Sequence, residues 1–264
     1  MKSRWKRLYN NEWVMTLLSF GVVILLWEAL VHFFKVQQWL LPAPSAILAE
    51  MLKSSGYLWM HTLVTLREVL IGFVLAFGVG ILLGVIIAYS PVLEKTLYKL
   101  LVATQSIPKV AIAPLLVIWL GLGQLTKVTM VFLMCFFPIM VGMVSGLQST
   151  HRELLELSDV LGAKWYQAFL KIRFPASLPY LFNGLRVSVS MAVIGAVISE
   201  FVNADKGLGY SLLITTSQMN GPLAFSVVTI LAALGIGLFS LVAWLEKRIC
   251  PWAKTSQSSS RAEG

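Results

Sequence analysis

Apolar residues fall in long runs separated by short polar segments, a pattern typical of helices that cross a bilayer. Such a span needs about 20 mostly apolar residues. Six segments reach that length, at 14–34, 68–89, 98–120, 125–147, 179–201 and 223–245. The ~10-residue alternating segments of an outer-membrane barrel do not occur in the sequence. We therefore predict an all-α polytopic membrane protein with about six transmembrane helices.

A proline-rich stretch separates the first two spans. Pro42 and Pro44 favour an extended chain, and Ser45 is placed to cap a helix over about 46–67. Charged residues such as Lys53 interrupt that helix, so we expect it to lie at the interface or to lead into the next span.

Small residues indicate how the spans pack. In the second span they recur every four residues, which places them on one helix face where a neighbour can approach closely. They are Gly72, Ala76, Gly80, Gly84 and Ala88, and the fifth span repeats the pattern less strictly with Ser188, Ala192, Gly195 and Ser199.

Composition agrees with a membrane protein. Of the 264 residues, 58% are hydrophobic and 12% are charged, about half the charged fraction of a soluble domain. The net charge is +9, which in a soluble protein would suggest nucleic-acid binding. Of 21 Lys and Arg residues, fourteen fall in or next to segments 1–13, 90–97, 148–178 and 246–264. Five fall in or next to the alternate segments, among them Lys127 at the border of a span. This is the distribution of cytoplasmic loops, so both termini are predicted inside and no nucleic acid is expected.

The predicted organisation has three parts. Residues 1–13 form a cytoplasmic N-terminus, and 14–250 form the transmembrane domain, with a cytoplasmic loop at 149–178. The first apolar run is longer than a signal-peptide core and no cleavage site follows, so we interpret it as an uncleaved span. The Ser-rich segment 251–264 is predicted to be a disordered cytoplasmic tail.

The long inside loop carries the most specific pattern. Ser149 or Thr150 can cap a helix whose first turns hold Glu153 and Glu156, where negative charge suits the helix dipole. Gly162 then permits the left-handed residue that ends a helix. A second amphipathic helix is predicted over about 164–172, after which Pro175 and Pro179 are expected to turn the chain back into the membrane. Spacing alone leaves two interpretations open, a docking element or an interfacial amphipathic hairpin.

This loop resembles the E-A-A-x3-G-x9-I-x-L-P pattern of permease subunits in bacterial ATP-binding-cassette (ABC) importers. Glu156, Gly162, Ile172 and Pro175 fall on the E, G, I and final P without gaps. The departures are Leu157 and Ser158 for the two alanines and Phe174 for the leucine. Segments 41–45, 106–114, 119–123, 136–138, 198–201 and 207–209 resemble the nitrate, sulfonate and taurine branch, which also includes permeases for pyrimidine precursors of thiamine.

The resemblance implies a type I importer permease that moves a small anion or a heterocycle across the bacterial inner membrane. It implies three kinds of partner: a cytoplasmic ATPase dimer, a second permease subunit that is commonly identical, and a periplasmic or lipid-anchored solute-binding protein. The sequence has no phosphate-binding loop of its own, so we expect a non-catalytic subunit without cofactor or metal. The residues implied in ATPase coupling are Glu153, Glu156, Asp159, Gly162, Ala163, Ile172 and Pro175.

Polar residues inside spans are the candidates for the translocation path, because burying them is costly unless they are paired or hydrated. Lys109, between two prolines, could meet an anionic solute at a break in the helix, or serve a pairing role. Arg186 could contact an anion, snorkel to the interface or pair with a loop. Glu200 is expected at the outer mouth, too far along the helix to pair with Arg186. The full set is Gln105, Ser106, Lys109, Asn183, Arg186 and Glu200.

Two other functions compete. A stand-alone secondary transporter or channel would place charged relays deep in several spans, whereas here deep charge is nearly confined to Lys109 and Arg186. A membrane enzyme is disfavoured because the three histidines, His32, His61 and His151, lie far apart without metal-ligand spacing.

Overall fold

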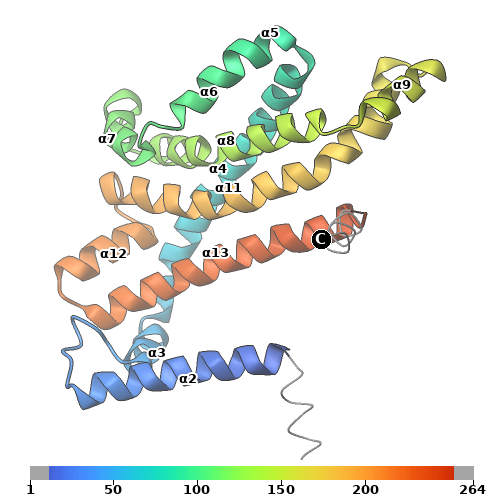
Figure 1. Ribbon diagram of the computed structural model, residues 1–264. Coiled ribbons are helices and arrows are strands. Elements are labelled where there is room, and N and C mark those ends of the chain that lie inside the picture. Colours follow the sequence, from blue (N-terminus) through green and yellow to red (C-terminus); the bar gives the residue numbers. More distant parts are fainter. Residues whose placement is uncertain (1–11, 253–264) are drawn as a thin grey trace, which may run out of the picture. The chain divides into compact units, whose positions relative to one another are not determined.

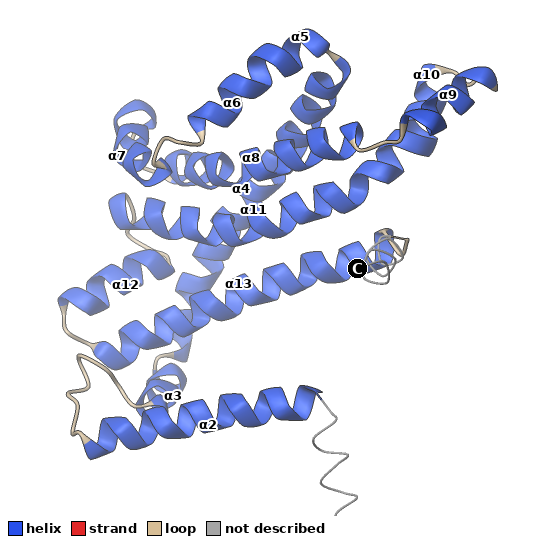
Figure 2. Ribbon diagram, viewed as in Figure 1, coloured by secondary structure: helices blue, strands red, loops and turns tan. Residues whose placement is uncertain are grey.

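The computed structural model describes residues 12–252, and every regular element in this range is a helix (Figures 1 and 2). The predictions for residues 1–11 and for the Ser-rich tail from 253 onward lie outside the described residues. The helices are α2 (Glu12–Phe33), α3 (Pro44–Lys53), α4 (Ser55–Tyr89), α5 (Pro91–Leu93), the π-helix η1 (Glu94–Tyr98), α6 (Lys99–Thr104), α7 (Lys109–Leu120), α8 (Gln124–Gln148), α9 (Arg152–Val160), α10 (Trp165–Ala168), the π-helix η2 (Phe169–Arg173), α11 (Phe174–Val202), α12 (Leu208–Ser217) and α13 (Gly221–Ile249).

Four continuous helical stretches of the described chain are long and apolar enough to cross a bilayer: α4, α8, α13 and the stretch Trp165–Val202 that ends with α11. A fifth span is made if the segments Pro91–Thr104 and Lys109–Leu120 count as one, although they meet at a bend of 93°. In α2 the described apolar part, Leu18–Phe33, is shorter. The all-α polytopic fold is therefore confirmed, with a helix at each of the six predicted positions and a break inside the one predicted at 98–120.

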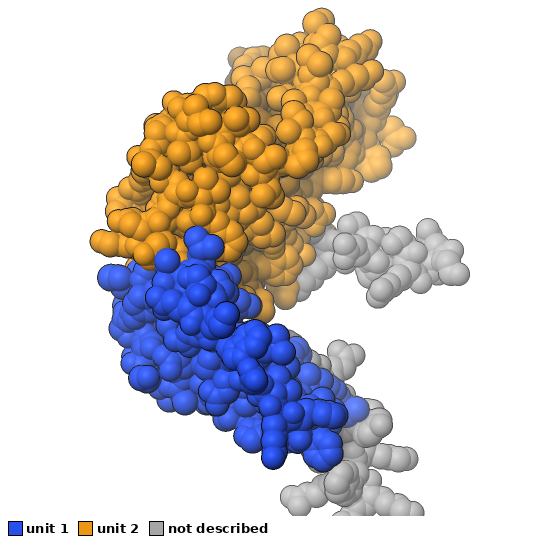
Figure 3. All heavy atoms as spheres, turned by 90° about the vertical axis from the view of Figure 1, so that its left-hand side faces the viewer, with its two compact units in different colours: residues 1–61, 211–230 blue, residues 62–210, 231–264 orange. Residues whose placement is uncertain are grey.

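The described chain forms two compact units, which Figure 3 colours separately. Unit 1 comprises residues up to His61 together with Ser211–Ile230, and unit 2 comprises Thr62–Tyr210 and the residues from Leu231 onward.

Unit 1 corrects the predicted cap at Ser45. Helix α3 begins at Pro44, and its N-cap is Ala43, with no side-chain cap. The Ser45 hydroxyl and amide instead donate to the carboxylate of Glu28 in α2, at 2.6 and 3.0 Å. A carboxylate is a stronger acceptor than a backbone group, so it orients Ser45 away from its own helix.

The boundary predicted at 67 was also wrong. Helix α3 ends at Lys53, and Ser54 closes it by donating through its amide and hydroxyl to Glu50. Helix α4 then runs unbroken for 35 residues, because no proline interrupts it and its glycines lie within an otherwise strongly apolar sequence. The mixed segment therefore leads directly into the second span.

Unit 2 is built on α8 and α11, which run antiparallel and side by side (Figure 1). Their backbones approach closely at glycines: a Cβ on Gly146 would lie 2.7 Å from the Ser177 carbonyl oxygen, and one on Gly142 would lie 2.8 Å from the Tyr180 carbonyl oxygen. The predicted small-residue face of α4 packs on α8, where a Cβ on Gly84 would lie 2.8 Å from Met143 Cβ. This close packing of small residues is the arrangement that the sequence predicted for the spans.

Helix α12 was not predicted. Its ten residues are too few for a span, so the search for apolar runs of span length did not identify it. The helix begins after Gly207, whose φ of +119° is a conformation that other residues rarely adopt.

Candidate functional site

The loop between α8 and α11 contains a short free-standing helix, α9. The predicted cap at Ser149 or Thr150 was wrong, because both hydroxyls bond back to α8, at the carbonyls of Gly146 (2.8 Å) and Leu147 (3.3 Å). The residue before α9 is instead His151, which makes no side-chain cap. These two hydroxyls therefore finish α8 rather than start α9.

Gly162 ends α9, as predicted. Its φ is +69°, its amide donates to the Asp159 carbonyl, and the Ala163 amide donates to the Ser158 carbonyl, both at 3.0 Å. These two bonds form the Schellman motif, in which a left-handed residue satisfies the last carbonyls of a helix. No atom lies within 4 Å of the position of a Cβ on Gly162, so the backbone conformation alone selects glycine here.

Helix α9 leaves large apolar side chains uncovered by the described chain. The exposed fraction is 55% for Leu157, 84% for Val160 and 76% for Leu161. Trp165, just beyond the turn, is 75% exposed. The acidic residues predicted for coupling, Glu153, Glu156 and Asp159, are exposed beside them, whereas Ala163, Ile172 and Pro175 are partly buried. An exposed apolar cluster bordered by polar residues is typical of an interaction site.

The second half of the loop is continuous with α11, so the prediction that Pro175 and Pro179 turn the chain was wrong. Helix α10, η2 and α11 form one apolar helical stretch, Trp165–Val202. Pro175 lies in the first turn of α11, where the missing N–H is tolerated, and the preceding π-helix at Phe169–Arg173 absorbs the change in hydrogen bonding.

This stretch is attached to the end of α4 through Tyr89. The Phe169 ring lies 5.8 Å from the Tyr89 ring, and the Arg173 guanidinium lies over that ring at 5.2 Å. The described part of the loop thus has a free helix, α9, followed by a helix that is continuous with a long apolar segment.

The break predicted near Lys109 is present between α6 and α7. Gln105 and Ser106 are exposed at the break, and Pro108 occupies the N-cap position of α7. Lys109 is half-buried, with its ammonium over the Phe137 ring at 4.9 Å. This cation–π contact partly satisfies the Lys109 charge without a carboxylate.

The candidates in α11 have different environments. Asn183 is exposed. The Arg186 guanidinium forms an ion pair with Glu246 in α13 and lies over the Phe239 ring at 5.9 Å, so its observed partners are on a neighbouring helix rather than on a loop. Glu200 is 1% exposed.

Glu200 belongs to a group of buried polar residues at the end of α8 and α11 farthest from α9. Its carboxylate accepts hydrogen bonds from the Thr65 hydroxyl (2.6 Å) and from the Gly209 amide. Glu68 in α4 forms an ion pair with Lys127 in α8, with 3.1 Å between Oε1 and Nζ. We call Thr65, Glu68, Lys127 and Glu200 the distal polar cluster.

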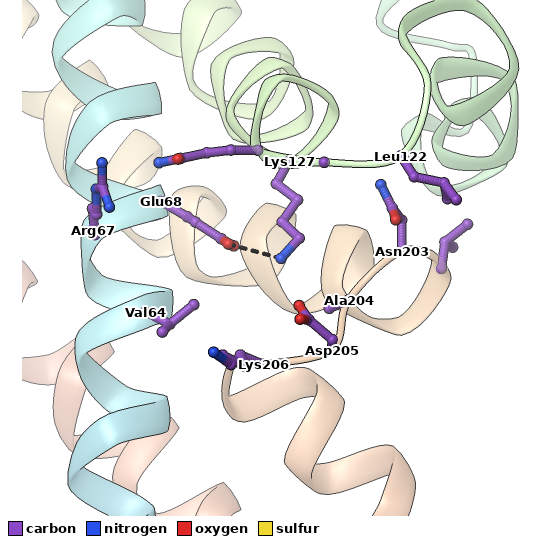
Figure 4. Close-up of a pocket in the computed structure, with 12 residues that line it drawn as sticks. Val64, Arg67, Glu68, Leu122, Lys127, Asn203, Ala204, Asp205 and Lys206 are labelled. Carbon is purple, nitrogen blue, oxygen red and sulfur yellow. Dashed lines mark ion pairs between the residues drawn. The ribbon is translucent and has the colours of Figure 1, made fainter.

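Two members of the distal polar cluster, Glu68 and Lys127, line a cavity of about 690 Å³ (Figure 4). Arg67, Asp205 and Lys206 are among the other lining residues. Of the four residues in the distal polar cluster, only Glu200 was a candidate from the sequence. Glu68 at the start of a predicted span was a further signal for buried charge. Lys127 gave none, because it was counted with a loop in the charge distribution.

The described residues contain no group of three or more His, Cys, Asp or Glu side chains that could hold a metal ion. Cys135 and Cys250 are free and buried.

Comparison with known proteins identifies the family. Residues 80–250 match the binding-protein-dependent transport system inner membrane component. A formylaminopyrimidine transport permease protein of Halalkalibacterium halodurans is 37% identical over 238 residues, covering 90% of this chain and 95% of the relative. A riboflavin transport system permease protein of Chloroflexus aurantiacus is 36% identical over 253 residues, covering 94% of each chain. Relatives named for aliphatic sulfonates and taurine confirm the expected branch.

The fold is also shared with a solved transporter. An inward-facing structure of the MetNI methionine ABC transporter matches with a TM-score of 0.57 at 20% identity, covering 76% of this chain and 98% of the solved chain. The expected importer-permease fold is thereby confirmed. With residues 80–250 matched and relatives aligned over nearly its whole length, the chain belongs to the family of inner membrane components of binding-protein-dependent ABC transport systems.

Proposed function

We propose that this permease binds its ATPase through α9, the Schellman turn at Gly162 and the start of α10. The observation that carries the proposal is the exposed apolar side chains of Leu157, Val160, Leu161 and Trp165 on an element that the rest of unit 2 leaves free. Exposed carboxylates of Glu153 and Glu156 beside them would give the contact a polar rim. An apolar centre with a charged rim suits a protein partner better than lipid, which supports docking over the interfacial hairpin.

Movement of α9 would reach the membrane-spanning part by two routes. Helix α8 ends where the loop begins, and α10 continues through η2 into α11. The Tyr89 contacts with Phe169 and Arg173 add α4 to the same group of helices. ATP-driven displacement of α9 would thus shift α4, α8 and α11 together.

The assembly proposed here has two copies of this chain, an ATPase dimer and a solute-binding protein. With α9 in the cytoplasm, the proposed topology has both termini on the cytoplasmic side of the inner membrane and the distal polar cluster on the opposite side. Helix α8 alone, with 25 residues, separates these two ends by about 37 Å.

For the solute we propose a nitrogen heterocycle rather than a sulfonate-type anion. Two relatives at 37% and 36% identity are named for formylaminopyrimidine and riboflavin, both nitrogen heterocycles. Lys109, the sequence candidate for meeting an anion, is half-buried and lies over the Phe137 ring. Binding assays with the purified solute-binding protein, using formylaminopyrimidine, riboflavin and taurine as probes, test this choice; saturable binding of taurine alone would contradict it.

The docking proposal is tested by co-purifying the ATPase with Gly162→Val, which strains the left-handed turn. Gly121→Val is a matched control, because Gly121 also has a positive φ (+77°) and open space around it but follows α7, at the far end of α8. We expect Gly162→Val to lose the ATPase and Gly121→Val to keep it. Wild-type recovery of the ATPase with Gly162→Val would refute docking at this turn.

A further inference from the structure

One threonine connects α4 to the segment that follows α11. The Thr65 hydroxyl donates to Glu200 Oε1 at 2.6 Å and accepts from the Leu208 amide at 2.8 Å. Thr65 is fully buried and Glu200 is 1% exposed, so water does not compete for these bonds. A single hydroxyl thus bonds the last turn of α11 and the first residue of α12 to the same point on α4.

Glu200 also determines the shape of the segment at 203–209. Its second carboxylate oxygen accepts a hydrogen bond from the Gly209 amide, and a Cβ on Gly207 or Gly209 would overlap the Glu200 side chain. Gly207 further needs its positive φ of +119°. The two glycines therefore let the backbone close around the carboxylate.

The ion pair between Glu68 and Lys127 fastens α4 to the first turn of α8 in the same region. Their side chains are only 4% and 9% exposed. Glu68 and Glu200 also interact electrostatically with each other and with Lys127, and Thr65 is hydrogen-bonded to Glu200, so the four side chains form one connected polar group. Removing either partner of such a buried pair would leave a charge without compensation.

These polar contacts differ from the packing farther along α4 and α8. There the two helices meet through small and apolar side chains, as at Gly72 and Val131 or Gly80 and Ile139. Apolar contacts tolerate small sliding, whereas hydrogen bonds weaken steeply with angle and distance. The directional contacts of the distal polar cluster hold the segment at 203–209 in one position relative to these helices.

We propose that Thr65 and Glu200 are positioning residues that make the segment at 203–209 follow the ATPase-driven movement of α4, α8 and α11. Without them the helices still move and ATP is still hydrolysed, but the segment no longer moves with the helices and less solute crosses per ATP. This inference rests on the proposed docking of the ATPase at α9.

The test compares Thr65→Val, which keeps the side-chain shape and removes the hydroxyl, with Thr65→Ser, which keeps the hydroxyl. Thr216→Val is the matched control, because the Thr216 hydroxyl is exposed and bonds only carbonyls of its own helix. The complete transporter is reconstituted in vesicles, and ATP hydrolysis is measured together with uptake of formylaminopyrimidine. We expect Thr65→Val to keep ATP hydrolysis within about twofold and to lower uptake per ATP about tenfold. Thr65→Ser and Thr216→Val should match the wild type.

A distance measurement tests the positioning without relying on the solute or the ATPase. Spin labels on cysteines replacing Leu125 and Lys206, both exposed, report the separation of α8 from the segment in the permease alone. We expect one narrow distance distribution in the wild type and Thr65→Ser, and a broad one in Thr65→Val. A narrow distribution together with wild-type uptake per ATP in Thr65→Val would overturn the proposal.

Glu200→Gln provides a second variant if Thr65→Val yields no assembled complex. It keeps the side-chain size and removes the charge, and we expect the same fall in uptake per ATP. If both variants only lower the amount of complex, with uptake per ATP unchanged, the residues are structural and the proposal is wrong. Failure of the wild type to bind its ATPase would instead refute the docking proposal and leave the distance test valid.

Discussion

Ser188 in α11 and Cys135 in α8 exchange two hydrogen bonds across the interface of these two helices. The Ser188 hydroxyl donates to the Cys135 carbonyl at 2.9 Å, and the Cys135 thiol donates to the Ser188 carbonyl at 3.2 Å. Both residues are fully buried. The pair fixes the register of α11 along α8, in a medium where interhelical hydrogen bonds add to the close packing of small residues.

We expect Ser188→Ala to destabilise the folded permease by about 0.5–1 kcal/mol, the usual worth of one such bond in a membrane protein. Ser190→Ala is the matched control, because its exposed hydroxyl bonds only a carbonyl of its own helix. Thermal unfolding in detergent, monitored by aggregation or loss of ATPase binding, should show a lower midpoint for Ser188→Ala alone. An equal shift in both variants would mean that the cross-helix bond contributes nothing.

Close approach of α8 and α11 also predicts the effect of Gly184→Ala. The added methyl would overlap the carbonyl group of Pro138, which belongs to the backbone and cannot move away as a flexible side chain would. We expect a loss of about 1–3 kcal/mol, typical of overpacking. Gly78→Ala, on a helix face with open space, should leave stability unchanged or raise it by about 0.5–1 kcal/mol. Similar folded yields for the two variants would argue against tight α8–α11 packing.

Local features of this chain could be predicted from the sequence because they depend on few neighbours. Long apolar runs predicted a helix at each of six positions, since burial in lipid is decided by composition over about 20 residues. The left-handed turn at Gly162 depends on its own backbone and was predicted correctly. The turn predicted at Pro175 was wrong, because a proline in the first turn of a helix is tolerated and need not redirect the chain.

The distal polar cluster could not be predicted in the same way. Glu68 and Lys127 are 59 positions apart, and their pairing depends on the rotation of α4 and α8 about their own axes. Hydropathy places a helix in the membrane without fixing that rotation. Charge counting even assigned Lys127 to a loop, because it lies only three residues into α8.

The ion pair of Arg186 and Glu246 discriminates between a structural and a solute-binding role for Arg186. Either single change, Arg186→Gln or Glu246→Gln, leaves the other charge unpaired and should lower the free energy of unfolding. The loss should be smaller than the about 3–5 kcal/mol of a fully buried pair, because the Arg186 side chain is 31% exposed. The double variant should recover most of this loss, because it removes both charges together.

Transport kinetics give the second measurement. If Arg186 contacts solute, the KM for solute rises in Arg186→Gln and is unchanged in Glu246→Gln. We expect no such difference.

Substitutions of Lys109 test whether the solute is a neutral heterocycle or an anion. Its ammonium lies over the Phe137 ring, so Lys109→Gln removes a cation–π contact worth about 0.5–2 kcal/mol and should modestly lower stability. Lys109→Arg keeps the positive charge and the ring contact and serves as the control.

For a neutral heterocycle, uptake by Lys109→Gln should stay near the wild-type rate at saturating solute, because no charge on the solute requires neutralisation. For an anion, loss of the positive charge should raise KM about tenfold in Lys109→Gln, while Lys109→Arg retains the wild-type value. A tenfold rise in KM would therefore reverse the choice of a heterocycle and return Lys109 to the translocation path.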